Sequence, residues 1–162
     1  MSLKIEICDP RDADALWCLG QYYAELNRRF AGGFDVNLSR DPEAGAMVAP
    51  RGAFLVARDA AGPLGCVGLK GGKDYAEIKR LWVAPHGRGR GLARALMAAV
   101  EQAARGLGIT LLRLDTNSAL PEAAALYRAT GWIGIARFND DPYPDLFFEK
   151  RLGPGPGPRA QE

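Results

Sequence analysis

Six consecutive residues, Arg88-Gly89-Arg90-Gly91-Leu92-Ala93, combine arginine and glycine between a predicted strand and a predicted helix. The first turn of a helix leaves N–H groups unpaired and carries partial positive charge, so it attracts phosphate groups. Glycine lets the backbone approach a ligand closely, and arginine adds charge and hydrogen-bond donors. The segment therefore predicts a phosphate-binding loop rather than a flexible turn with solvated arginines.

The glycine spacing excludes two common nucleotide-binding motifs. The Walker pattern GxxxxGK[ST] is absent, and the loop reads GxGxG where the dinucleotide pattern would read GxGxxG. Residues 78–100 contain five basic residues and no acidic residue, whereas the whole chain has a net charge of +2. Nucleic-acid-binding domains usually spread basic residues more widely and have a pI above about 9, whereas the pI here is about 8.5. This distribution indicates a local anionic ligand and argues against nucleic acid.

The strand that precedes the loop, over residues 75–83, departs from simple alternation. Its apolar positions are Ile78, Leu81 and Val83, and the step from 78 to 81 breaks the period of two. A β-bulge between them would return both residues to one face of the sheet. Such a bulge would also free a backbone N–H near the strand end, where it could stabilise a developing oxyanion.

Apolar periodicity and turn residues predict the remaining elements. Strands are predicted at 3–8, 53–58, 64–70, 111–114, 132–138 and 146–150, and helices at 10–30, 92–107 and 123–129, with a short helix near 42–48. This order favours one α+β domain over residues 1–152, with a mixed central sheet of about six to seven strands and about four helices. The Gly/Pro repeat over residues 153–162 predicts a disordered tail.

Length and composition set further limits. A chain of 162 residues suits one domain. No apolar run reaches the length of a membrane span, and the N-terminus lacks the features of a signal peptide. Cys8, Cys18 and Cys66 form an odd set without a CxxC pair, so we expect free thiols and a cytoplasmic protein. His86 is the single histidine, so we expect no metal site.

Three segments together resemble the GNAT superfamily of N-acyltransferases. They are the strand 78–83, the pattern Arg88-x-x-Gly91-x-Ala93, and the downstream segment Ala123-x-x-Leu126-Tyr127-x3-Gly131-Trp132. The acyl-CoA signature of that family is Gln/Arg-x-x-Gly-x-Gly/Ala, and the order of elements over residues 3–152 is also similar to its fold. The resemblance implies transfer of an acyl group, with acetyl expected, from acyl-CoA to a primary amine by direct attack in a ternary complex.

The resemblance also implies where coenzyme A binds. Its diphosphate would lie on the backbone N–H groups of Arg88, Gly89, Arg90, Gly91, Leu92 and Ala93, and its pantetheine arm would pair with Leu81, Trp82 and Val83. Many relatives carry an asparagine contacting the cofactor three residues before the alanine of the Ala-x-x-Leu-Tyr segment. This chain has Leu120 there, and Asn117 is the nearby candidate for that contact.

Two residues are candidates for proton transfer. Tyr127 occupies the position at which the family often uses a tyrosine to protonate the departing thiolate, although a tyrosine on an amphipathic helix can simply pack. Glu77 lies on the strand that would pass the acyl group and is our candidate general base, because the amine must lose a proton before attack. Glu77 could equally be a surface carboxylate paired with a neighbouring basic residue, and Asp115 and Asn117 are alternatives.

The acceptor is the part that the sequence specifies least. The family shapes this side with the first helix region and the last hairpin, which here contain Tyr22, Tyr23, Arg28, Arg29, Phe34, Asn139, Asp140, Asp141 and Tyr143. We expect a small amine or peptide acceptor and neither a nucleic acid nor a membrane partner, and a homodimer is left open. The alternative from another class is a non-catalytic acyl-CoA sensor, which would bind the cofactor and release no thiol.

Overall fold

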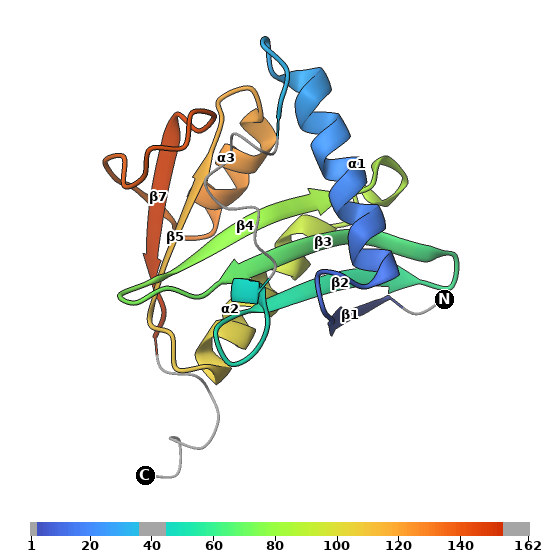
Figure 1. Cartoon of the computed structure of the whole chain (residues 1–162), viewed down its shortest axis with the longest axis horizontal. Helices are drawn as coiled ribbons and strands as arrows, with labels where there is room; N and C mark the ends of the chain where they lie inside the picture. Colours follow the sequence, from blue (N-terminus) through green and yellow to red (C-terminus); the bar gives the residue numbers. More distant parts are fainter. Residues whose placement is uncertain (1–2, 36–44, 154–162) are drawn as a thin grey trace.

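A computed structural model describes residues 3–35 and 45–153, which form one seven-stranded sheet in the order β1-β2-β3-β4-β5-β7-β6 (Figure 1). Strands β4 and β5 pair in parallel, and the other neighbouring strands pair antiparallel, so the sheet is mixed as predicted. The strands are β1 (Lys4–Ile7), β2 (Ala53–Asp59), β3 (Gly62–Lys70), β4 (Ala76–Val83), β5 (Leu111–Thr116), β6 (Ile133–Gly134) and β7 (Leu146–Arg151).

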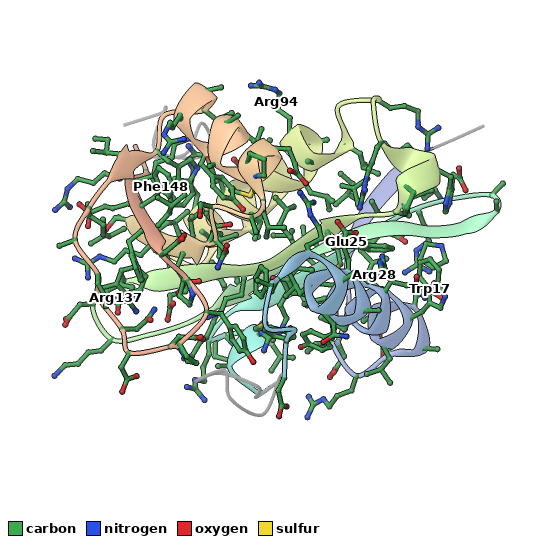
Figure 2. The ribbon with its side chains drawn as sticks, turned by 90° about the horizontal axis from the view of Figure 1, so that it is seen from above. Trp17, Glu25, Arg28, Arg94, Arg137 and Phe148 are labelled. Carbon is green, nitrogen blue, oxygen red and sulfur yellow. The ribbon has the colours of Figure 1, made fainter. Side chains whose placement is uncertain are left out.

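Helices cover both faces of this sheet. Helix α1 (Ala13–Arg29) lies on one side, and α2 (Leu92–Gly106) and α3 (Pro121–Ala129) lie on the other (Figure 2). The predicted helix over 92–107 is confirmed, and its apolar residues Leu92, Leu96 and Val100 are buried in the core between α2 and the sheet. A second core between α1 and the sheet explains why both faces of the central strands are apolar.

The described residues contain three α-helices, one fewer than predicted. The predicted helix near 42–48 lies mostly outside the described residues, and its described part holds the 3₁₀ turn η2 (Gly45–Met47). The predicted tail also lies outside them from residue 154 onward. Within the described parts of the chain, no helix has both the length and the apolar character needed to cross a bilayer.

The predicted strand over 132–138 is wrong in its length, because β6 contains only two residues. Backbone pairing continues only to Ile135, whose N–H donates to the Phe147 carbonyl. Beyond it, the Arg137 guanidinium donates to the backbone carbonyls of Asp141 and Pro144 at 3.1 and 2.9 Å. These bonds fold the chain into a loop, and the alternation of apolar residues does not predict that loop.

The β-bulge predicted in β4 is confirmed. Lys79 pairs with Gly68 while Trp82 pairs with Cys66, so β4 holds one extra residue there. Arg80 sits in the bulge with a φ of 59°, a conformation that is rare for residues other than glycine. As expected, the apolar side chains of β4 on both sides of the bulge contribute to the same core.

The parallel pair β4–β5 opens shortly after it begins. It is limited to Ala76 opposite Leu112 and Glu77 opposite Arg113. Beyond these pairs the two strands separate (Figure 1), so one edge of β4 faces the gap between them from Ile78 onward. The strand predicted at 111–114 is β5, and it lies between β4 and β7.

Candidate active site

The glycine- and arginine-rich loop leads into α2 and leaves the backbone N–H groups at the start of that helix accessible. Gly89 and Gly91 have φ values of 79° and 73°, in the left-handed region that glycine adopts without strain. Gly91 is the N-cap of α2, and no side chain among the described residues caps this end. The bond from Ala95 N–H to the Gly91 carbonyl is the first of the helical ladder, which leaves the N–H groups before it without helical partners. The geometry therefore suits an anion, as predicted.

A cleft of about 340 Å³ lies beside this loop. Its walls come from the end of β4, the loop, the start of α2, and one face each of α1 and α3. The predicted cofactor residues that line it are Leu81, Trp82, Val83, Arg88, Gly89, Gly91, Leu92 and Ala93. We refer to this cavity as the loop cleft.

Two predicted cofactor residues do not line the loop cleft. Arg90 is exposed and lies outside its wall. Asn117 lines a neighbouring cavity instead, and its side chain is occupied with the chain itself. Its Nδ2 donates to the Tyr143 carbonyl at 2.6 Å, and its Oδ1 accepts from the Ala119 N–H at 2.7 Å.

The edge of β4 that borders the loop cleft can pair with an extended chain. Ala84 N–H donates to the Leu64 carbonyl of β3 at 2.7 Å. Because hydrogen-bonding direction alternates along a strand, the polar groups of Trp82 also face β3, and those of Leu81 and Val83 face the cleft. The Val83 carbonyl accepts there from Nε of Arg88 at 2.9 Å. A bound extended molecule with amide groups could take up such positions, as an added strand does.

Charged side chains connect the three elements around the mouth of the loop cleft. Glu25 of α1 accepts from Nη2 of Arg88 at 2.6 Å, from the Trp82 indole at 3.0 Å and from Arg29 at 3.2 Å. Arg29 also bonds to Glu122 of α3, at 2.9 Å through Nη2. Figure 2 shows Glu25 between α1 and the sheet. Burial alone would raise the pKa of Glu25, but the hydrogen bonds from Arg88 and Trp82 outweigh it and hold that pKa below its usual range.

Glu25→Gln is expected to lower the stability of the fold at neutral pH, and the stability of the variant should fall less than that of wild type as the pH is lowered. A carboxylate with a lowered folded-state pKa stabilises the fold above its unfolded pKa, and this contribution disappears as the pH falls through the folded value. The difference in Tm between wild type and variant should therefore be largest near neutral pH and shrink below about pH 4.5. Thermal unfolding from pH 7 to 3 measures it, with the exposed Glu6→Gln as control. An equal difference at every pH would contradict the assignment.

A second cavity, of about 100 Å³, adjoins the loop cleft. Leu81 of β4 and Tyr22 of α1 line both, so the two spaces meet at the edge of β4. Tyr127 and Asp115 line this second cavity, which we call the acceptor cavity. Nδ2 of Asn139 donates to Asp115 at 2.8 Å.

Tyr127 is held in the wall of the acceptor cavity by its own packing. Its side chain is almost fully buried on α3, and its ring contacts Trp132 and Phe148. Burial, and then the negative charge of Asp115, raise the pKa of Tyr127 above its usual value. Its hydroxyl is protonated at neutral pH, as that of an ordinary tyrosine is, and the raised pKa makes it a weaker acid.

Glu77 is absent from the lining of both cavities, in contrast to Asp115. Its carboxylate lies 3.7 Å from Nζ of Lys79 and 4.0 Å from Nζ of Lys70. Ion pairing is the alternative to a base role that the sequence left open, but the Glu77 side chain is only 14% exposed and is not at the surface. The structure thus brings together Tyr127 and Asp115, and it places Glu77 at the paired start of β4.

Several residues predicted for the acceptor side do meet in the acceptor cavity, namely Tyr22, Tyr23, Phe34, Asp141 and Tyr143. Arg28 and Asp140 are exposed instead. Sequence reasoning missed Glu25 and Glu122 at the loop cleft. A signal existed for Glu25, because the face of α1 that carries Tyr22 and Leu26 also carries Glu25 and Arg29 at helical spacing.

Comparisons with known proteins agree with this geometry. Residues 50–133, just over half of the chain, match the family model of the acetyltransferase (GNAT) domain. A stretch of 102 residues is 36% identical to an uncharacterised N-acetyltransferase of Schizosaccharomyces pombe, and one of 107 residues is 38% identical to an IAA acetyltransferase of Azospirillum brasilense. Each match covers 61% of this chain, and they cover 63% and 67% of the two relatives.

Two solved structures share the fold. A GNAT family acetyltransferase of Staphylococcus aureus has a TM-score of 0.79 at 16% identity, with 94% of this chain and 100% of that chain covered. The PaiA N-acetyltransferase of Thermoplasma acidophilum, solved in complex with coenzyme A, has a TM-score of 0.69 at 18% identity, with 94% and 100% covered. The sheet of seven strands and its helices are therefore an acetyltransferase fold.

Proposed function

Because the chain belongs to the GNAT acetyltransferase family, we propose that it transfers an acyl group, in the first instance acetyl, from acyl-CoA to the primary amine of an acceptor. One observation carries the proposal: the uncapped start of α2 and the free edge of β4 border the same cleft. Coenzyme A combines a diphosphate with an extended, amide-containing arm. The residues present fit both parts.

The backbone holds the acyl donor in this proposal. The N–H groups of Leu92 and Ala93 and the charge of Arg88 bind the diphosphate, because a helix start attracts anions. The polar groups of Leu81 and the N–H of Val83 align the pantetheine arm along β4, while Arg88 occupies the Val83 carbonyl. A backbone N–H of this edge then donates to the thioester oxygen as negative charge develops on it. Acetyl-CoA supplies the activated acyl group and a good leaving group.

The acceptor cavity supplies the proton transfers. Asp115 accepts the proton that the amine must lose, and Tyr127 donates a proton to the departing sulfur. The raised pKa of Tyr127 makes its phenol a weaker acid, so the transfer depends on how the hydroxyl is placed beside the sulfur. Asp115 takes the role for which the sequence favoured Glu77, since Asp115 lines the cavity.

Asp115→Asn is expected to lower kcat/KM for the amine by about 10²-fold, as loss of a general base does. Glu77→Gln is the matched control and should retain kcat/KM within about twofold, because Glu77 lines neither cavity. Steady-state rates at saturating acetyl-CoA measure both. A wild-type kcat/KM in Asp115→Asn together with a loss of about 10²-fold in Glu77→Gln would restore Glu77 as the base.

Release of free thiol from acetyl-CoA, measured with a panel of primary amines, tests the proposed function itself. An enzyme releases thiol only when a suitable amine is present, and mass spectrometry finds the acetylated amine. The alternative, a sensor, binds coenzyme A and releases no thiol with any amine. Binding without turnover across the panel would replace the proposed function by the sensor.

A further inference from the structure

The acceptor cavity is lined by aromatic rings to an unusual degree. Six of its lining residues are Tyr22, Tyr23, Phe30, Phe34, Tyr127 and Tyr143. They come from α1, the segment after α1, α3, and the loop before β7. The rings hold one another in place: centroids of Phe34 and Tyr143 are 4.6 Å apart, and Tyr23 stacks on Phe34 at 5.7 Å. The Tyr143 hydroxyl also accepts from the Asp35 N–H at 2.7 Å.

Two basic and two acidic side chains line this cavity. Lys79 lies 3.7 Å from Glu77, which is outside the cavity. Arg80, which donates to the Tyr23 hydroxyl, and Asp141, which accepts from the Tyr143 N–H, are buried and opposite in sign. Asp115 is the second carboxylate of the lining, and its Oδ2 accepts from Nδ2 of Asn139 at 2.8 Å.

The volume limits what the cavity can hold. It measures about 100 Å³. For comparison, an engineered apolar cavity of about 150 Å³ is large enough to bind benzene. The acceptor cavity is smaller than that, so a single six-membered ring fits it only by reaching toward the loop cleft, and two fused rings fit less well. Aromatic walls favour an aromatic guest through edge-to-face and offset contacts.

We propose that the acceptor is a small primary amine carrying a single aromatic ring, with its ammonium group at Asp115 and its ring against Phe34 and Tyr143. The inference rests on the proposed function. In the reaction, a bond forms between the amine nitrogen and the acyl carbon, and the carbon–sulfur bond breaks. The ammonium gives one proton to Asp115 before the attack. The sulfur leaves with the proton of Tyr127, and the second proton lost by the nitrogen restores the Tyr127 hydroxyl. The products are the N-acyl amine and free coenzyme A.

A matched panel of amines tests the class. The panel contains 2-phenylethylamine, 2-cyclohexylethylamine without the aromatic face, phenylalanine with an added carboxylate, and tryptamine with two fused rings. We expect kcat/KM for 2-phenylethylamine to exceed that of each other amine by about tenfold or more. Equal or better use of any of the other three would overturn the inference and leave the proposed function intact.

A variant separates ring recognition from general damage. Phe34→Leu should reduce the preference for 2-phenylethylamine over 2-cyclohexylethylamine to less than about threefold, with an unchanged KM for acetyl-CoA. Tyr75→Leu is the control, because Tyr75 is half-buried and lines neither cavity. An undiminished preference in Phe34→Leu would contradict the ring assignment.

The failure of the inference is distinguishable from failure of the proposed function. If no amine of this panel is acetylated while the wider panel of primary amines yields acetylated products, the inference alone is overturned. If neither panel yields product although calorimetry detects coenzyme A binding, the sensor replaces the proposed function. If coenzyme A does not bind, the proposed function fails at the donor site. Acetylation of the amines with no preference overturns the inference alone.

Discussion

Tyr127→Phe is expected to lower kcat by about 10²–10³-fold, the usual contribution of a positioned proton donor. The KM for acetyl-CoA should change by less than about twofold, because the loop cleft does not include Tyr127. Phenylalanine keeps the ring contacts with Trp132 and Phe148, so the fold is preserved. The variant therefore removes the hydroxyl and little else.

Single-turnover and steady-state rates between pH 6 and 9 measure this effect. Tyr22→Phe is the matched control, since Tyr22 carries another hydroxyl in the same cavity and should cost far less. The raised pKa of Tyr127 means that its own ionisation does not limit the rate over this range. Wild-type turnover in Tyr127→Phe would assign the residue to packing, the alternative that the sequence had left open.

Ala93→Asp is expected to raise the Kd for coenzyme A by about 10²-fold or more, because like charges brought together cost several kcal/mol. Ala93 lies in the first turn of α2 and lines the loop cleft. A carboxylate there would face the diphosphate. The same carboxylate interacts favourably with the helix start, by about 0.3–1 kcal/mol, so stability should not fall.

Two comparisons isolate this effect. Ala98→Asp makes the same change on the exposed face of α2 and should leave the Kd near that of wild type. S-acetylpantetheine lacks the diphosphate, so wild type and Ala93→Asp should use it equally. A similar loss with S-acetylpantetheine would mean that Ala93→Asp distorts the cleft rather than repelling phosphate.

The parts of this molecule that the sequence predicted are those whose signals are local. The glycine loop immediately precedes α2. The apolar residues Leu92, Leu96 and Val100 recur at helical spacing and form the buried face of that helix. The break in the alternation of apolar residues after Ile78 indicates the bulge. Each signal involves residues within one or two elements. These same elements form the wall of the loop cleft, so most of the predicted cofactor residues line it.

The proton acceptor could not be chosen from the sequence, because the choice depends on where β4 and β5 separate. Glu77 lies opposite Arg113 in the short paired region, and the gap opens only beyond it. Asp115 lies on the far side of that gap. Which carboxylate faces the cavity is thus a property of the sheet and not of either strand alone.

The aromatic lining of the acceptor cavity and the polar contacts around it could not be predicted from the sequence either. Phe34 and Tyr143 touch although they are far apart in the chain, and Asn117 is drawn away from the loop cleft by the Tyr143 carbonyl. The loop after Gly134 is fixed by Arg137 bonding to backbone carbonyls. Such long-range polar contacts leave no periodic trace in the sequence.

Titration calorimetry of the full chain with coenzyme A and with pantetheine, at low ionic strength, tests the central claim most directly. If the start of α2 seats the diphosphate, coenzyme A binds one to one and pantetheine binds at least about 10²-fold more weakly, since it lacks the charged group that the helix start attracts. The advantage of coenzyme A should shrink as salt is added. No heat with coenzyme A, or equal affinity for the two molecules, would contradict the account.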